Sequence, residues 1–324
     1  VIGHGTAAVA GAAVADAFER YLKGSGIRIE SKIASELSGF SPDEDLSDAL
    51  VIPITQSGTT TDTNRAVAMA AEKGATIVSI VNRRQSDITM KSHGVFYTSD
   101  GRDIEMSVAS TKAFYSQIVA GHVFALNLAQ IAGTLDDETL AAELANLEEA
   151  PARMADVVRR GEAVRQCAET LYQKRYWAVV GSGPNKVAAD EIRIKLSELC
   201  YRTISSDIVE NKKHIDLSAE PLILVCAAGS PEAVLADIAK DVAIFKAHKA
   251  SVAVFADEGD DRFDEVSDAV LPLPRSAPPL PVILNTLAGH LWGYYAACRI
   301  DEEAALLREF RSRLNLTMVE QART

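Results

Sequence analysis

The stretch Trp177-Ala-Val-Val-Gly-Ser-Gly183 has the composition of a short buried strand that ends in a glycine-rich turn. A helix-like run follows it from about residue 186 to 201. The first half of the chain has the same arrangement, because Gly3-His4-Gly5 ends a short apolar stretch and precedes a helix-like run over residues 7–22. A strand, a glycine turn and a helix in succession predict parallel α/β structure.

The order of elements continues to match in both halves of the chain. The paired segments are strands 49–54 and 222–227, helices 61–73 and 231–248, strands 76–81 and 251–255, short strands 94–97 and 269–273, and closing helices with Ala120-Gly-His122 and Ala288-Gly-His290. This repetition predicts an α/β fold of two tandem doubly wound parallel-sheet domains flanked by helices. We place the first domain at residues 1–150 and the second, with a C-terminal tail, at residues 151–324. Residues 135–175 are expected to be helical, and the segment from Glu302 onward is expected outside the repeat, where it can fold back over a site.

Composition narrows the class of protein. The chain of 324 residues is 48% hydrophobic and 24% charged, which excludes disordered and fibrous classes. Its net charge of -12 disfavours a nucleic-acid partner, because an acidic surface repels a phosphate backbone. No apolar run is long enough to span a bilayer, so no membrane partner is expected. The four cysteines form no CxxC pair, which predicts reduced thiols in a cytoplasmic protein.

Neither a dinucleotide fingerprint nor a metal-binding motif is present. The glycine turns at residues 3–5 and 181–183 lack the third glycine and the acidic residue that a dinucleotide site requires. We therefore expect no cofactor and no metal.

The most polar strand end is Thr55-Gln-Ser-Gly-Thr-Thr-Thr-Asp-Thr63, with six hydroxyl side chains in nine positions. Hydroxyls, backbone N–H groups and a helix N-terminus together can hold a phosphate without a lysine. The alternative is an ordinary turn with an N-cap, since serine and threonine cap helices routinely. The number of hydroxyls favours phosphate here, whereas the equivalent turn at residues 228–231 is poor in hydroxyls.

A second set of polar residues lies in the other half. Glu191, Lys195 and Glu198 are spaced to share one helix face, and a polar loop with His214 follows. These side chains have the chemistry for enolisation of a sugar phosphate, in which a proton moves between adjacent carbons. The alternative is a solvated, salt-bridged face. His122 and His290 lie in apolar helices and are interpreted as core residues.

Three segments carry a resemblance to a known family. They are Ile33-Ala-Ser-Glu-Leu37, Thr55-Gln-Ser-Gly58 with Asp62-Thr63, and Val108-Ala-Ser-Thr-Lys-Ala-Phe114. With the internal repeat, they resemble the double sugar-isomerase (SIS) domain of the glutamine:fructose-6-phosphate amidotransferases, also called glucosamine-6-phosphate synthases. The resemblance is stronger in the first half of the chain.

The resemblance implies the following binding residues. The sugar phosphate is held by Thr6, Thr55, Gln56, Ser57 and Thr60. The sugar pocket is lined by Val108 and Ser110.

The resemblance also implies catalytic roles in the second half. Lys195 and Glu198 match positions that assist enolisation, with Glu198 as the base that moves a proton between C1 and C2. His214 matches the family's ring-opening histidine, which comes from the neighbouring subunit. A homodimer with a site shared between subunits is therefore expected.

The chain departs from the family pattern in three ways. The family's Lys-His-Gly-Pro is Lys213-His214-Ile215-Asp216 here. Asn315 stands where the family has a lysine that forms a Schiff base with the keto sugar, and no lysine follows Lys249. No N-terminal cysteine nucleophile precedes the SIS part, so we expect the chain as given to lack a glutaminase domain.

These features together predict a phosphosugar aldose–ketose isomerase of the aminotransferase type, acting on fructose 6-phosphate, glucosamine 6-phosphate or a close derivative. The alternatives are a stand-alone fructosamine-phosphate deglycase, a glucosamine-6-phosphate deaminase-like enzyme, and a non-catalytic SIS protein that senses phosphosugars.

Overall fold

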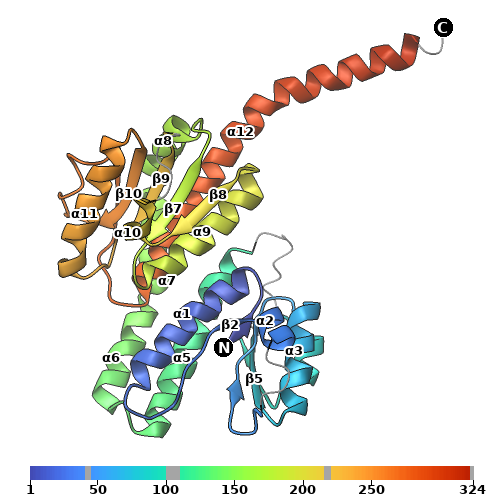
Figure 1. The fold of residues 1–324 in the computed structure, drawn as a ribbon, viewed down its shortest axis with the longest axis vertical. Helices are drawn as coiled ribbons and strands as arrows, with labels where there is room; N and C mark the ends of the chain where they lie inside the picture. Colours follow the sequence, from blue (N-terminus) through green and yellow to red (C-terminus); the bar gives the residue numbers. More distant parts are fainter. Residues whose placement is uncertain (41–44, 100–109, 215–219, 322–324) are drawn as a thin grey trace. The chain divides into compact units, whose positions relative to one another are not determined.

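The structure, a computed structural model, describes residues 1–40, 45–99, 110–214 and 220–321. Its contacts divide the chain into two compact units. Unit 1 consists of Val1–Arg153 and Ser276–Ile283, and unit 2 consists of Met154–Arg275 and Leu284–Thr324. Each unit has parallel strands flanked by helices, as the sequence predicts (Figure 1).

The strands of unit 1 are short and all pair in parallel. β1 pairs with β2, β5 pairs with β3, β4 and β6, and a bridge between Ile2 and Pro53 joins the two groups. The strand order is therefore β2, β1, β3 with β4, β5 and β6. The elements are β1 (Ile2–Gly3), α1 (Thr6–Tyr21), β2 (Lys32–Ile33), α2 (Ala34–Phe40), β3 (Leu50–Val51), β4 (Ile54–Thr55), α3 (Thr61–Glu72), β5 (Thr76–Val81), α4 (Asp87–Met90), β6 (Gly94–Tyr97), α5 (Lys112–Ala132) and α6 (Asp137–Glu148).

The single strand expected over residues 49–54 is divided into β3 and β4. Pro53 lies between them and has no N–H to donate to a neighbouring strand. Its carbonyl still accepts a hydrogen bond from the Ile80 N–H at 2.9 Å, so the chain stays extended along β5.

Unit 2 has one parallel sheet with the strand order β8, β7, β9, β10 and β11. The corresponding strands of unit 1 have the same order, which is β2, β1, β3 with β4, β5 and β6. The elements are α8 (Gly161–Leu171), β7 (Trp177–Gly181), α9 (Asn185–Cys200), β8 (Ile204–Asp207), α10 (Val209–Lys212), β9 (Leu222–Cys226), α11 (Glu232–Ala247), β10 (Ser251–Asp257), β11 (Ala269–Leu273) and α12 (Leu280–Gln321), while α7 (Ala150–Arg159) contains the boundary between the units.

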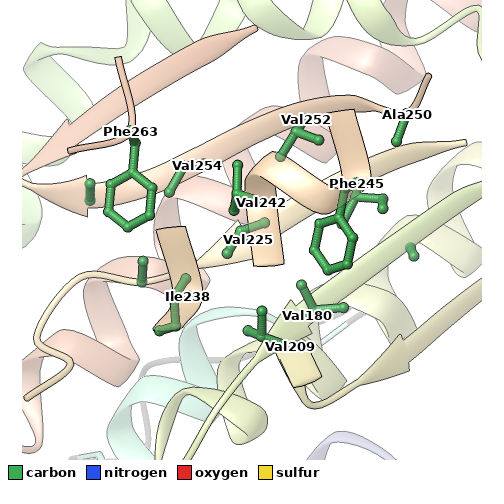
Figure 2. Close-up of a cluster of buried hydrophobic side chains, with 14 of the residues drawn as sticks. Val180, Val209, Val225, Ile238, Val242, Phe245, Ala250, Val252, Val254 and Phe263 are labelled. Carbon is green, nitrogen blue, oxygen red and sulfur yellow. The ribbon is translucent and has the colours of Figure 1, made fainter. Parts of the chain in front are cut away.

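The core of unit 2 lies between the sheet and α11 (Figure 2). Valines of three strands face this helix, which contributes Ile238, Val242 and Phe245. Several of these side chains are fully buried, as expected for parallel strands that are covered on both faces.

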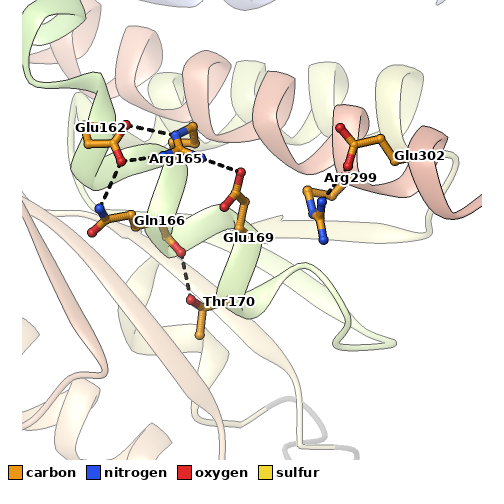
Figure 3. Close-up of polar contacts among 7 residues, drawn as sticks. All are labelled: Glu162, Arg165, Gln166, Glu169, Thr170, Arg299 and Glu302. Carbon is orange, nitrogen blue, oxygen red and sulfur yellow. Dashed lines mark hydrogen bonds and ion pairs between the residues drawn. The ribbon is translucent and has the colours of Figure 1, made fainter.

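One face of α8, in unit 2, is polar and has charged side chains that pair with one another. Arg165 there contacts Glu162 and Glu169 one turn away, and Gln166 donates to Glu162 at 3.0 Å (Figure 3). Exposed ion pairs of this kind add little to the stability of a helix, because water and salt screen them. The opposite face of α8 is buried at Val164, Cys167 and Ala168.

The segment after Glu302 does not fold back. It continues α12 as far as Gln321, so the expectation of a returning tail is wrong for the residues described. Residues 294–321 contain no glycine or proline and are rich in Ala, Leu, Glu and Arg, so nothing in the sequence ends the helix. Figure 1 shows this part of α12 extending beyond the sheet of unit 2.

In each unit, the helix that follows the first strand of the sheet repeat packs closely against a later helix at a glycine. A Cβ added to Gly121 of α5 would lie 2.1 Å from a methyl carbon of Val14 in α1. A Cβ added to Gly289 of α12 would lie 2.3 Å from Ile192 in α9. The same contact is therefore made by the same tripeptide, Ala-Gly-His, in both halves.

The contact at Gly121 predicts a specific loss of stability. Gly121→Ala places a methyl group inside the radius of a fully buried Val14 and should lower the free energy of unfolding by about 1–3 kcal/mol. Gly39→Ala in α2 is the matched control, because its added Cβ meets nothing within 4 Å and alanine favours helix. Urea unfolding of the two variants checks this, and equal stabilities would contradict the close contact.

His122 is a buried, neutral core residue, as the sequence indicated. Its Nδ1 lies 3.1 Å from the Ile118 carbonyl, and its ring packs edge-on against Tyr21. Burial lowers the pKa of His122 from 6.5 to about 4. The unfolded chain therefore takes up a proton at this residue at a higher pH than the folded chain does.

The lowered pKa predicts how stability depends on pH. The contribution of a neutral His122 is complete above pH 6.5 and is lost as the pH falls from 6.5 toward 4, by about 2–3 kcal/mol. His122→Gln should lose less stability than the wild type between pH 7 and pH 4.5, measured by urea unfolding. Parallel losses in the two proteins would show that this histidine is not held neutral.

Candidate functional site

The hydroxyl-rich segment is the loop between β4 and α3 in unit 1. β1 and β4 are neighbours, and from them the strand order runs in opposite directions, to β2 on one side and to β5 on the other. In doubly wound sheets, ligands bind at the carboxyl ends of strands at such a reversal. Thr55 is buried, and Gln56, Ser57 and Thr60 are half-buried, so the loop presents part of its polar surface.

The loop is organised by its own side chains. The Gly58 N–H donates to Thr55 Oγ1 at 3.2 Å, and the Thr59 N–H donates to Ser57 Oγ at 3.3 Å. Gly58 has φ +68°, and a Cβ there would lie 2.0 Å from Ser86 Oγ, so only glycine fits. Thr60 stands at the N-cap of α3 but makes no capping hydrogen bond with its side chain. The N-cap interpretation thus does not account for the Thr60 hydroxyl.

Two residues that the sequence analysis missed support the loop. Asn64 Nδ2 of α3 donates to the Gly58 and Thr60 carbonyls, each at 3.1 Å. Lys91 Nζ in turn donates to Asn64 Oδ1 at 3.0 Å. Asn64 follows the loop by one helical turn, which is the spacing that could have suggested its role.

The turn after β1 lies beside this loop. Thr6 begins α1, and His4 Nε2 in the same turn lies 3.7 Å from Asp62 Oδ2 at the start of α3. The structure therefore brings the turn that carries Thr6 to the N-terminus of α3. Ser110 is half-buried just before α5, whereas Val108 lies outside the described residues.

The charged residues of α9 form a buried group in unit 2. Lys195 Nζ lies 2.8 Å from Glu198 Oε2 and 3.6 Å from Glu191 Oε1. The side chains of Glu191 and Lys195 are 0% and 1% exposed, whereas that of Glu198 is 39% exposed. The interpretation as a solvated face is wrong for Glu191 and Lys195. A carboxylate that reaches solvent while paired with a buried ammonium is placed to accept a proton from a bound molecule.

His290 is buried, as the sequence indicated, and has a charged neighbour. Its Nε2 lies 3.6 Å from Glu191 Oε1, and its side chain is 8% exposed. The sequence placed His290 in an apolar helix and gave no sign of this neighbour, because α9 and α12 are far apart in the chain.

His214 is exposed and follows α10 directly. Its N–H donates to the Asn211 carbonyl at 3.0 Å, while Lys213 pairs with Glu210 at 2.7 Å and with Asp241 at 3.3 Å. In the described parts of the chain, no hydrogen bond or ion pair joins His214 to Glu198. Ile215 and Asp216 lie outside the described residues.

The turn after β9 is the counterpart of the hydroxyl-rich loop, and its groups bind one another. The Gly229 N–H donates to Asp257 Oδ2 at 3.0 Å, and Asn185 Nδ2 donates to the Ala228 carbonyl at 2.9 Å. Burial raises the pKa of Asp257. The Asp257 carboxylate therefore accepts a hydrogen bond from the Gly229 N–H in the turn after β9.

The described residues contain neither a metal-binding cluster nor a membrane-spanning helix. No group of three or more His, Cys, Asp or Glu side chains there is arranged to hold a metal ion. Within the same residues, none of the helices is long and apolar enough to cross a membrane.

The chain is similar in sequence to known proteins. Residues 1–127 match the family model of the SIS domain. A glutamine–fructose-6-phosphate aminotransferase [isomerizing] of Streptomyces coelicolor is 32% identical over 305 residues, which cover 93% of this chain and 48% of the relative. The chain thus spans about half the length of the curated relatives it matches.

Solved structures share the fold. The C-terminal domain of a glucosamine-fructose-6-phosphate aminotransferase from Francisella tularensis superposes with a TM-score of 0.81 at 23% identity, covering 92% of this chain and 82% of that one. A glucosamine-6-phosphate deaminase from Thermotoga maritima superposes with a TM-score of 0.67 at 17% identity, covering 92% and 84%. The chain therefore contains an SIS domain in residues 1–127. Nearly the whole chain is homologous to a region that makes up about half the length of each isomerizing glutamine–fructose-6-phosphate aminotransferase that it matches.

Proposed function

We propose that the chain is a phosphosugar aldose–ketose isomerase domain, built from two tandem SIS-type domains at residues 1–150 and 151–324. Its substrate is fructose 6-phosphate, glucosamine 6-phosphate or a close derivative. The observation that carries the proposal is the contact of 2.8 Å between the buried Lys195 ammonium and the partly exposed Glu198 carboxylate. The names of the relatives, which are aminotransferases of the isomerizing type, support the same chemistry.

The phosphate is held by the loop between β4 and α3. Thr55, Gln56, Ser57 and Thr60 offer hydroxyls and backbone donors there, and the turn with Thr6 lies beside them. The N-terminus of α3 adds the positive end of a helix dipole. Ser110 and Val108 line the sugar in this proposal.

In this proposal, Glu198 is the base that moves the proton between the sugar carbons. Its carboxylate takes a proton from the carbon next to the sugar carbonyl, which leaves an enediolate, and returns it to the former carbonyl carbon, while the proton of the adjacent hydroxyl passes to the former carbonyl oxygen. Lys195 keeps a positive charge against this carboxylate and orients it. His214 opens the sugar ring from the partner subunit of a homodimer. The exposure of His214 supports this assignment.

Asn315 favours a second candidate, an SIS protein that binds phosphosugars without turnover. An asparagine amide cannot form a Schiff base with a keto sugar, so amination through residue 315 is chemically unavailable. Deglycase and deaminase activities remain further alternatives, and the same experiment separates the catalytic options from the sensor.

Isotope exchange tests the proton shuttle. Incubation with fructose 6-phosphate or glucosamine 6-phosphate in deuterated water should place deuterium on the carbon beside the carbonyl, as read by NMR. Glu198→Gln should lower the rate by roughly a hundredfold or more, since a positioned base contributes about 10²–10⁴-fold. Glu302→Gln, which removes only an exposed carboxylate, is the matched control. Tight binding of the sugar without exchange would contradict the proposed isomerase activity and support a protein that binds phosphosugars without turnover.

Removal of hydroxyls tests the phosphate loop. Ser57→Ala with Thr60→Ala should weaken phosphosugar binding by about tenfold or more, because hydrogen bonds to a charged group are worth about 1.5–3 kcal/mol each. Thr170→Ala is the control, since its hydroxyl only bonds to the Gln166 carbonyl within α8. Calorimetric titration measures both, and unchanged affinity of the double variant would remove the assignment.

A further inference from the structure

The segment that follows β5 lies against the hydroxyl-rich loop of unit 1. The Arg83 N–H donates to the Gln56 carbonyl at 3.1 Å, and the Ile88 N–H donates to the Gly58 carbonyl at 3.2 Å. Both carbonyls belong to the loop between β4 and α3. The chain continues from Arg83 into Arg84, so two guanidinium side chains leave the backbone beside this loop.

Both arginine side chains are exposed, and they lie where β5 ends at the carboxyl edge of the sheet. Arg84 Cζ lies 4.3 Å from the centre of the Tyr97 ring, which ends the neighbouring strand β6. A guanidinium over an aromatic ring still has N–H donors at its edges that can bind an anion. Within the described residues, no hydrogen bond or ion pair holds the Arg83 guanidinium, so it is able to turn toward a ligand.

The charge at this edge differs between the two units. β5 pairs with β4 and β6 as β10 pairs with β9 and β11, so β4 corresponds to β9 and β5 to β10. The loop and the segment against it in unit 1, residues 55–64 and 82–91, contain three basic and two acidic side chains. The corresponding residues of unit 2, 226–235 and 257–266, contain one basic and seven acidic side chains. An anion is therefore favoured at unit 1 and repelled at unit 2.

One of the acids of unit 2 also binds the turn there. The Asp257 carboxylate at the end of β10 accepts the Gly229 N–H at 3.0 Å. In unit 2, a carboxylate of the chain itself thus binds a backbone donor of the turn after β9. In unit 1, the residues that follow β5 are cations instead.

We propose that Arg83 and Arg84 supply the positive charge that holds the phosphate of the substrate at the hydroxyl-rich loop. This inference rests on the proposed function. Hydroxyl groups are neutral donors, so they orient the oxygen atoms of a phosphate but do not balance its charge. A phosphate dianion is repelled by a chain with a net charge of -12, and two guanidinium groups at the loop offset this repulsion locally. The arginines thereby select an anionic sugar, while the hydroxyls set its position.

A binding measurement tests the two arginines. Fructose 6-phosphate is titrated calorimetrically, with inorganic phosphate as a competitor, into the wild type and into Arg83→Gln with Arg84→Gln. The double variant should bind both ligands about tenfold more weakly or worse, because it lacks two charged donors to a dianion. Arg175→Gln is the matched control and should bind as the wild type does. Arg175 also lies over a tyrosine ring, at 5.3 Å, but it precedes β7 and is therefore at the amino end of a strand.

Two further measurements separate charge from a merely structural role. Arg83→Lys with Arg84→Lys keeps both charges and should bind within about threefold of the wild-type affinity. The affinity of the wild type should fall as the ionic strength rises, and that of the double glutamine variant should fall less, because fewer charges remain to be screened. A structural role would give the lysine and glutamine variants the same loss and would leave the salt dependence unchanged.

The possible failures are distinguishable. Unchanged affinity of the glutamine variant, or equal losses in the glutamine and lysine variants, overturns the inference. If Ser57→Ala with Thr60→Ala weakens binding and the arginine variants do not, the phosphate loop stands and only the role of the arginines is wrong. If the wild type binds neither fructose 6-phosphate nor phosphate, the proposed phosphate site is wrong and the inference falls with it.

Discussion

The ammonium of Lys195 is 1% exposed, and an ion removed from water to this degree needs compensation from charges close by. Glu191 and Glu198 provide it from the same helix, one turn away on either side. α12 packs closely on the same helix, because a Cβ added to Gly289 or Gly293 would overlap Ile192 or Leu196 of α9. The helix that carries these charges is therefore held by a close contact that involves no charged group.

The two units share one arrangement of strands and helices but have different polar residues on it. In both, a strand ends in a glycine turn, and the helix that follows it meets a glycine of α5 in unit 1 or of α12 in unit 2. In unit 1, hydroxyl side chains lie at the end of β4. In unit 2, the Asp257 carboxylate accepts a backbone hydrogen bond at the corresponding strand end, and α9 carries the buried charges. The contact places a glycine against a branched apolar side chain in both units, so it does not depend on the polar residues that differ between them.

Much of the fold follows from the sequence, since β5, β6 and β11 have the predicted bounds. Buried parallel strands are continuous apolar runs, and glycine turns mark their ends, so local pattern suffices. Two expectations failed for identifiable reasons. Pro53 divides a strand through its missing N–H, and the tail after Glu302 remains helical because no residue there stops a helix.

The candidate site was predictable only where its residues are close in sequence. The loop at residues 55–60 and the pair Lys195 and Glu198 lie within single segments. The support of the loop by Lys91 and the contact of His290 with Glu191 join distant segments. No spacing rule connects such segments, because the distance between them is set by packing. His122 and His290 share the tripeptide Ala-Gly-His but have different neighbours, a backbone carbonyl for His122 and the Glu191 carboxylate for His290.

The resemblance to the SIS family implies a lysine where this chain has Asn315, and this difference separates two reactions that the proposed function could combine. Moving a proton between adjacent sugar carbons needs a base and a means of stabilising the enediol, and it needs no imine. Transfer of nitrogen to a keto sugar through a lysine needs the free amine that Asn315 does not have. If the base and its buried partner persist without that lysine, isomerisation is the activity that the remaining residues can still support. The retained charges of α9 therefore argue for proton transfer rather than for amination through the tail.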